Sequence, residues 1–233
     1  MAVITTGWGI GRCRRDFSSD ECIMTNSVIA GLFLTLGVSN AELLAQAAPP
    51  VSPASLTIEL AGGSSFEQRG REQLDRLLVA YDLSPWLFTR TVRIQSRVVP
   101  HSHPVLTVNT AYLANDTAQL ATFLHEQLHW WFAGRQAATD AAMGELQQLY
   151  PDAPDGPPLG ARDRQSTYLH LLVCLGEFDV VRQLFGEAVA RRTLAAWQHY
   201  PWVYREVLER QAPIRAILDR HSLTIPGTMG AVR

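Results

Sequence analysis

The sequence predicts an α+β fold, in which a small N-terminal β-sheet precedes a predominantly helical remainder. Short runs of β-like character all occur before residue 110, and apolar residues recur at helical spacing from Asp116 onward. A group of strands followed by a group of helices is typical of an α+β domain. The chain has 233 residues, of which 47% are hydrophobic and 18% are charged, so it can bury a core of domain size.

The N-terminal segment has the order of features found in a secretory signal. Arg12, Arg14 and Arg15 come first, an apolar run over residues 28–38 follows, and Ala45-Gln46-Ala47 offers a cleavage site between small residues. The apolar run is too short to span a bilayer. We therefore expect a leader that is removed, and no stable membrane span in the mature chain.

This order divides the chain into a leader over residues 1–47, an Ala/Pro-rich linker over 48–54 and a folded domain over 55–233. A functional leader would export the protein to the periplasm or the medium. The alternatives are an ordinary N-terminal helix or a misplaced start codon, and both would leave the protein in the cytoplasm. The net charge of −2, with both signs spread along the chain, argues against nucleic acid as a partner.

Three strands are expected in the first half of the domain. They are Ser55 to Leu60, Thr91 to Val99, and Val105 to Asn109. The last two are separated by a segment with prolines at both ends, Pro100 and Pro104, which disfavour ladder pairing there. His101 and His103 lie between these prolines and point the same way in extended backbone. They are either exposed turn residues or additional metal ligands or substrate contacts.

Helices are expected wherever apolar residues recur on one face. The segments are Phe66 to Tyr81, Asp116 to Gly134, Ala137 to Tyr150, Ser166 to about Phe185, Glu187 to Gln198, and Trp202 to Arg220. Asp116 followed by Gln119 has the pattern of a capping box. The prolines and glycines between Asp152 and Arg164 predict a long loop, and no regular structure is expected after His221.

A His-Glu-x-x-His motif lies in the second of these helices. His125 and His129 are one turn apart on one face, so both imidazoles can bind one zinc ion. Glu126 lies beside that metal and suits a general base acting on water. The helix is apolar on nearly every side and is therefore expected to be buried. Because an unpaired buried carboxylate is costly, a metal is the partner that this group of side chains requires.

This motif resembles the active-site helix of the zincin metallopeptidases, in which the third zinc ligand comes from later in the chain. The pattern does not extend to that of the metzincins, because the residues from Trp130 to Gln136 include no histidine. The resemblance implies a zincin-like fold and a zinc-dependent peptidase. Such an enzyme hydrolyses peptide or protein substrates by metal-activated water, with Glu126 as the general base.

The candidates for the third ligand lie in the predicted helix that begins at Ser166. Between Tyr168 and Phe178 only His170 and Glu177 are strongly polar, and they lie on one face two turns apart. That separation, about 10.8 Å, is too long for both to bind one ion. The gluzincin branch of the zincins uses a downstream helical glutamate, which implies Glu177 as ligand and His170 as a catalytic or supporting hydrogen-bond donor. The reverse assignment, with His170 on zinc and Glu177 orienting a ligand imidazole, stays open.

Further candidates lie outside these two helices. Tyr200 and Tyr204 surround a helix start with hydrogen-bond donors that could stabilise an oxyanion, although core packing explains them equally well. Cys174 is expected to be a small core residue. The zincin resemblance also implies that the strand from Val105 to Asn109 pairs with extended substrate, the alternative being an ordinary inner strand.

Two other functions are compatible with these residues. A zinc site closed by four protein ligands would make the chain a non-catalytic binding module. An open site could also hydrolyse amides other than peptides, because activated water attacks any carbonyl.

Overall fold

A three-stranded parallel sheet forms the first part of the computed structural model, which describes residues 56–228. The strands are β1 (Thr57–Leu60), β2 (Thr91–Ile94) and β3 (Leu106–Val108), in that order across the sheet. They fall within the three predicted runs but are shorter. The predicted leader and linker lie outside the described residues.

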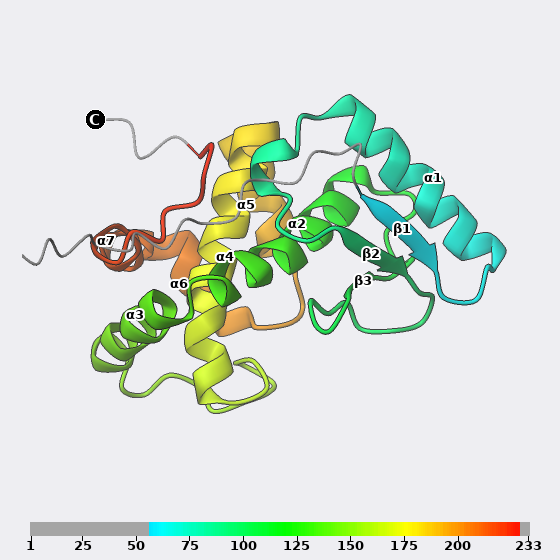
Figure 1. Cartoon of the computed structure of the whole chain (residues 1–233). Coiled ribbons are helices and arrows are strands. Elements are labelled where there is room, and N and C mark those ends of the chain that lie inside the picture. The colour runs from blue at the N-terminus through cyan, green and yellow to red at the C-terminus, as the bar shows by residue number, and fades with distance from the viewer. Residues whose placement is uncertain (1–55, 229–233) are drawn as a thin grey trace, which may run out of the picture. The chain divides into compact units, whose positions relative to one another are not determined.

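The two connections within the sheet are of different kinds. β1 and β2 are joined through the helix α1 (Ser65–Ala80) and a short 3₁₀ turn (Ser84–Trp86), as a parallel pair requires. β2 and β3 are also parallel but are joined without a helix, by the segment 95–105. We call this segment the return segment, because it must run back along the sheet before β3 can begin (Figure 1).

The return segment passes the outer edge of β3. His101 and Thr107 form an antiparallel bridge, in which the His101 N–H lies 3.0 Å from the Thr107 oxygen and the Thr107 N–H lies 2.7 Å from the His101 oxygen. The Asn109 side chain donates a further hydrogen bond to the carbonyl of Val98. The edge of β3 is therefore occupied at Thr107, and the return segment lies outside it.

Helices make up the remainder, in agreement with the predicted α+β class. They are α2 (Asp116–Ala133), α3 (Gln136–Leu149), α4 (Arg164–Phe185), α5 (Glu187–Ala195), α6 (Pro201–Glu209) and α7 (Gln211–Arg220). The single helix predicted from Trp202 to Arg220 is divided at Arg210. Pro213 explains the break, because its ring would clash with the carbonyl of Glu209 in a continuous helix.

The start of α2 differs from the predicted capping box. Asn115 is the N-cap, and its side chain accepts a hydrogen bond from the Ala118 N–H. Asp116 instead accepts hydrogen bonds from Arg76 and Gln73 of α1, which tie the two helices together. The capping box of this protein lies at the start of α1, between Ser64 and Glu67.

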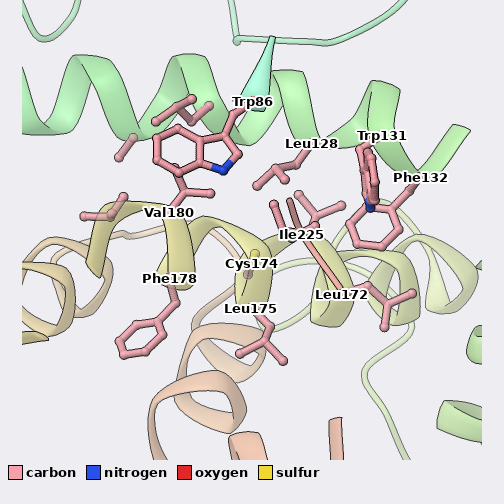
Figure 2. Packing of buried hydrophobic residues seen from close by; sticks show 14 of the residues in the cluster. Trp86, Leu128, Trp131, Phe132, Leu172, Cys174, Leu175, Phe178, Val180 and Ile225 are labelled. Carbon is pink, nitrogen blue, oxygen red and sulfur yellow. The ribbon is translucent and has the colours of Figure 1, made fainter. Parts of the chain in front are cut away.

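The core is centred on α4, which packs against α2, α3, α5, α6 and α7 (Figure 1). Figure 2 shows apolar side chains filling the space between α2 and α4, among them Leu128 and Ile225. A Cβ atom at Gly176 of α4 would lie 3.1 Å from Ile225 and 3.3 Å from Leu128. Glycine at this position therefore allows close packing directly beside Glu177.

The segment after His221, for which no structure was expected, is packed against the core. Leu223 and Ile225 are buried. The indole N–H of Trp131 donates to the carbonyl of Leu223, and that of Trp86 donates to the carbonyl of Pro226. Leu223 and Ile225 alternate with polar residues as in a strand, but two apolar positions are too few to predict an element, so sequence periodicity missed this segment.

Residues 56–228 all belong to one compact unit. Within residues 56–228, no helix combines the length and the hydropathy that crossing a membrane requires.

Candidate metal centre

The side chains of the His-Glu-x-x-His motif lie on the inner part of α2. His125 and Glu126 are 7% and 6% exposed, and His129 is partly exposed. The apolar surroundings that predicted burial are present, because Phe123, Leu124 and Leu128 are fully buried. The motif therefore places three polar side chains directly beside buried apolar ones.

His170 of α4 completes a triangle of imidazole rings with His125 and His129. The ring centroids are 5.1 Å apart for His125 and His129, 5.6 Å for His125 and His170, and 5.0 Å for His129 and His170. One nitrogen from each ring lies within 4.8 Å of the other two. Ligands of a tetrahedral zinc ion are roughly 3.3 Å apart, so small side-chain rotations would bring the three nitrogens to a common ion.

Hydrogen bonds determine which ring nitrogen of His170 and of His125 can bind a metal. His170 Nδ1 lies 2.6 Å from the carbonyl oxygen of Ser166, which can only accept, so Nδ1 carries the proton. His125 Nδ1 lies 2.9 Å from Glu177 Oε2 and donates to that carboxylate. In both rings Nε2 is therefore the nitrogen that can bind a cation, in His125 after it releases its second proton, and such partners on the far nitrogen are usual for histidines that bind metals.

Glu177 accepts hydrogen bonds from three directions. Its Oε2 accepts from His125 and from the Tyr204 hydroxyl at 2.9 Å, and its Oε1 accepts from the Trp197 indole at 2.9 Å. The side chain is 1% exposed. With both oxygens engaged, this carboxylate is arranged to hold the His125 ring.

A second group of ligand atoms involves His125, Cys174 and Glu177, which also lie within 4.8 Å of one another. Burial raises the pKa of the Cys174 thiol, so in the metal-free protein it is neutral. A neutral thiol is a poor metal ligand. The oxygens of Glu177 are already used, so the three histidines form the better metal site.

Burial sets the protonation of the histidines. It lowers the pKa of His129 well below the usual value and that of His170 to about 3, with the charge of His125 contributing to both. Burial opposes the charged form of His125 as well, but hydrogen bonds with Cys174 and Glu177 outweigh it and raise the pKa. His129 and His170 are thus neutral at pH 7 and have lone pairs available to a cation.

Glu126 differs from Glu177 in its surroundings. Burial raises its pKa to about 6, only partly offset by the charges of His125 and His101. A carboxylate with a pKa near neutrality can both accept and return a proton.

Tyr200 is held over the centre by a strained backbone. Its φ of 51° and ψ of 44° lie in the left-handed region, which a non-glycine residue before proline seldom adopts. Its ring centroid lies 4.4 Å from that of His170. No hydrogen bond among the described residues uses the Tyr200 hydroxyl, so it is available to a ligand, whereas the Tyr204 hydroxyl is committed to Glu177.

Two adjoining cavities give access to the centre. A cavity of about 600 Å³ and another of about 300 Å³ share Pro100, His125, Glu126 and Tyr200. The return segment lines both cavities, with Val99 on the smaller one and His101 and His103 on the larger one. The two histidines are exposed, as the turn interpretation predicts, and they face the cleft without joining the triangle.

The structure thus brings together four of the sequence candidates, His125, Glu126, His129 and His170, and places Glu177, the favoured third ligand in the sequence analysis, behind His125. Trp197, Ser166 and Cys174 were missed as partners of the centre. For Ser166 and Cys174 a signal existed, because both lie four residues from His170 and share its face of α4.

Comparison of the chain with protein-family models, with curated proteins and with solved structures found no match. The chemistry of the centre must therefore be argued from its own residues.

Proposed function

We propose that this protein is a zinc-dependent hydrolase that cleaves peptide bonds, with His125, His129 and His170 as the metal ligands and Glu126 as the general base. The observation that carries the proposal is the convergence of three imidazoles next to a buried carboxylate in a cleft. Imidazole nitrogens suit zinc, and three protein ligands leave one position for water, as in catalytic sites. This count supports an enzyme over a closed structural site.

The ligand set differs from the gluzincin-like assignment, in which Glu177 binds the metal. The hydrogen bond from His125 Nδ1 to Glu177 supports the other assignment, because a carboxylate on the far nitrogen fixes the orientation of a ligand histidine. Tyr204 and Trp197 hold that carboxylate in turn.

Zinc would supply a Lewis acid that polarises the substrate carbonyl and lowers the pKa of water to about 7. Glu126 would accept the proton of the attacking water and pass it to the leaving amine, which its pKa of about 6 allows. The free Tyr200 hydroxyl is available to donate a hydrogen bond to the oxyanion that forms on the substrate. Peptide is the favoured substrate because two cavities border His125 and Glu126, which leaves room for the side chains that flank a scissile peptide bond.

The test compares wild type, Glu126→Gln and the control Glu72→Gln, an exposed glutamate of α1. Metal content is measured by mass spectrometry and hydrolysis is measured on a mixed peptide library. We expect bound zinc in all three proteins and a loss of about 10²–10⁴ in rate for Glu126→Gln alone. Equal rates in the zinc-loaded wild type and Glu126→Gln would refute the mechanism, and a wild type that binds no zinc would refute the centre.

A further inference from the structure

We infer that the smaller cavity is a specificity pocket that receives one bulky, uncharged side chain of the substrate, aromatic or large aliphatic, next to the bond that is cleaved. This inference rests on the proposed peptidase function. We call the cavity the aromatic pocket. Besides the residues shared with the larger cavity, its walls are Val99, Asn109, Tyr112, Thr122, Glu177, Trp197, His199 and Tyr204.

The position of the aromatic pocket decides which substrate residue enters it. It borders His125 and Glu126, the side chains proposed to hold zinc and to deprotonate water, and it shares Pro100 and Tyr200 with the larger cavity. A side chain that fills it must therefore belong to a residue flanking the scissile bond. Its volume of about 300 Å³ is at the lower limit of small-molecule pockets, which suits a single large side chain.

The walls of the pocket favour an apolar ring. The Tyr112 and Trp197 rings lie 5.4 Å apart at 59°, and the Trp197 and His199 rings lie 5.5 Å apart at 33°. These are distances at which aromatic rings attract one another, and a substrate ring can join such a group. Apolar side chains buried here also gain the free energy of leaving water.

The charges around the pocket disfavour ionised side chains. No lysine or arginine is among its described lining residues, and in the proposed enzyme His125, which also lines it, would be bound to zinc while Glu126 would face the attacking water. Glu177 has both oxygens engaged by His125, Tyr204 and Trp197, so it offers little to a substrate cation. The larger cavity is different, because it is lined by Asp140, Arg162, Gln136 and Gln165 and can accept polar side chains.

Thr122 offers a way to change the pocket without touching the metal centre. It lies one turn before Glu126 on α2, is half-buried, and contributes to the pocket wall. Thr117 is also half-buried on α2 but is not part of the wall, so it provides a matched control for the same substitution.

The first experiment sequences the products that zinc-loaded wild type makes from an unbiased peptide library. We expect Phe, Tyr, Trp, Leu and Met to be enriched at least tenfold over Asp, Glu, Lys and Arg at one of the two positions flanking the cut. Thr122→Phe should abolish this enrichment and retain cleavage next to Gly or Ala, whereas Thr117→Phe should keep the wild-type profile. Tyr112→Ala, which enlarges the pocket, is the second variant if Thr122→Phe does not fold, and it should shift the preference toward the largest side chains.

The second experiment measures binding without turnover. Calorimetry with zinc-loaded Glu126→Gln should show about tenfold tighter binding of a short peptide containing Phe than of its Ala counterpart, and Thr122→Phe in the same background should remove the difference. Cleavage that depends on Glu126 but shows no enrichment, or enrichment of charged residues, would overturn the pocket and leave the peptidase standing. Absence of cleavage that depends on Glu126 would overturn both.

Discussion

In the proposed centre, individual hydrogen bonds distinguish His170, a metal ligand, from Glu177, which would position a ligand. The Ser166 carbonyl holds the Nδ1 proton of His170 and leaves Nε2 free, while Glu177 faces the Nδ1 proton of His125. A ligand and a residue that positions a ligand respond differently to substitution, because only the first contributes a bond to the metal.

We therefore expect His170→Ala to lose zinc, and Glu177→Gln to retain it with an affinity weakened about 10–100-fold. Glutamine keeps an acceptor for the His125 N–H but removes the negative charge behind it. Competition with a chromophoric chelator measures both affinities. The opposite order, with zinc lost in Glu177→Gln and retained in His170→Ala, would assign Glu177 as the ligand.

Tyr200 gives a second prediction for a single residue. Tyr200→Phe removes the free hydroxyl and keeps the ring against His170, so kcat should fall about 10²–10³-fold with zinc content unchanged. Tyr81→Phe, at a partly buried tyrosine in another part of the fold, is the control and should keep wild-type kcat. An unchanged kcat in Tyr200→Phe would show that the tyrosine only packs against the ring.

At the level of elements, α1 and α2 are joined by an ion pair that depends on pH. Hydrogen bonds from Arg76 and Gln73 lower the pKa of Asp116 to about 2. The folded pKa lies below the unfolded value of about 3.9, so the stabilisation is complete above pH 3.9 and is lost as the pH falls through about 2.

We expect Asp116→Asn to lower the free energy of unfolding at pH 6, and this difference from wild type to shrink between about pH 4 and pH 2. Urea unfolding across that range measures it. The difference should be small, because the Asp116 side chain is 43% exposed. Asp152→Asn, at an exposed loop carboxylate, should show no such trend, and a trend of the same size there would mean that the ion pair contributes nothing specific.

Elements were predictable where a local pattern determines them. Helical spacing located α1 to α5 within a few residues at most ends, and the alternating runs located all three strands. The ends and breaks of the helices depend on competing contacts, some of which come from residues far away in sequence. Asn115 and Asp116 can both cap a helix, and Arg76, far away in sequence, engages Asp116. Pro213 was a local signal for the division of the last helix and was overlooked.

For the whole molecule, the packing of α2 on α4 brings the site together and depends on the C-terminal segment. His125 and Glu177 are 52 residues apart in sequence, and only tertiary packing makes them partners. The His-Glu-x-x-His motif and the polar residues of α4 were recognisable from the sequence. The role of Trp197 was not, because no spacing connects an indole on the loop after α5 to a carboxylate on α4.

Ile225 tests this packing, because its side chain and that of Leu128, both labelled in Figure 2, lie next to Gly176. Ile225→Ala should lower the free energy of unfolding by about 2–5 kcal/mol, the usual range for a buried isoleucine. Val79→Ala, at a side chain that is 89% exposed, should change it by less than about 0.5 kcal/mol. Equal effects in urea unfolding would mean that the segment after His221 adds nothing to the core.

The three histidines and both glutamates of the centre come from only two helices, α2 and α4. In the sequence, the centre consists of two short motifs, His-Glu-x-x-His and His-x-x-x-x-x-x-Glu. The residues between these motifs contribute no side chain to it. Any chain that carries the two motifs in this order, each inside a buried apolar helix and with the helices packed side by side, would be expected to form the same centre, whatever fills the sequence between them.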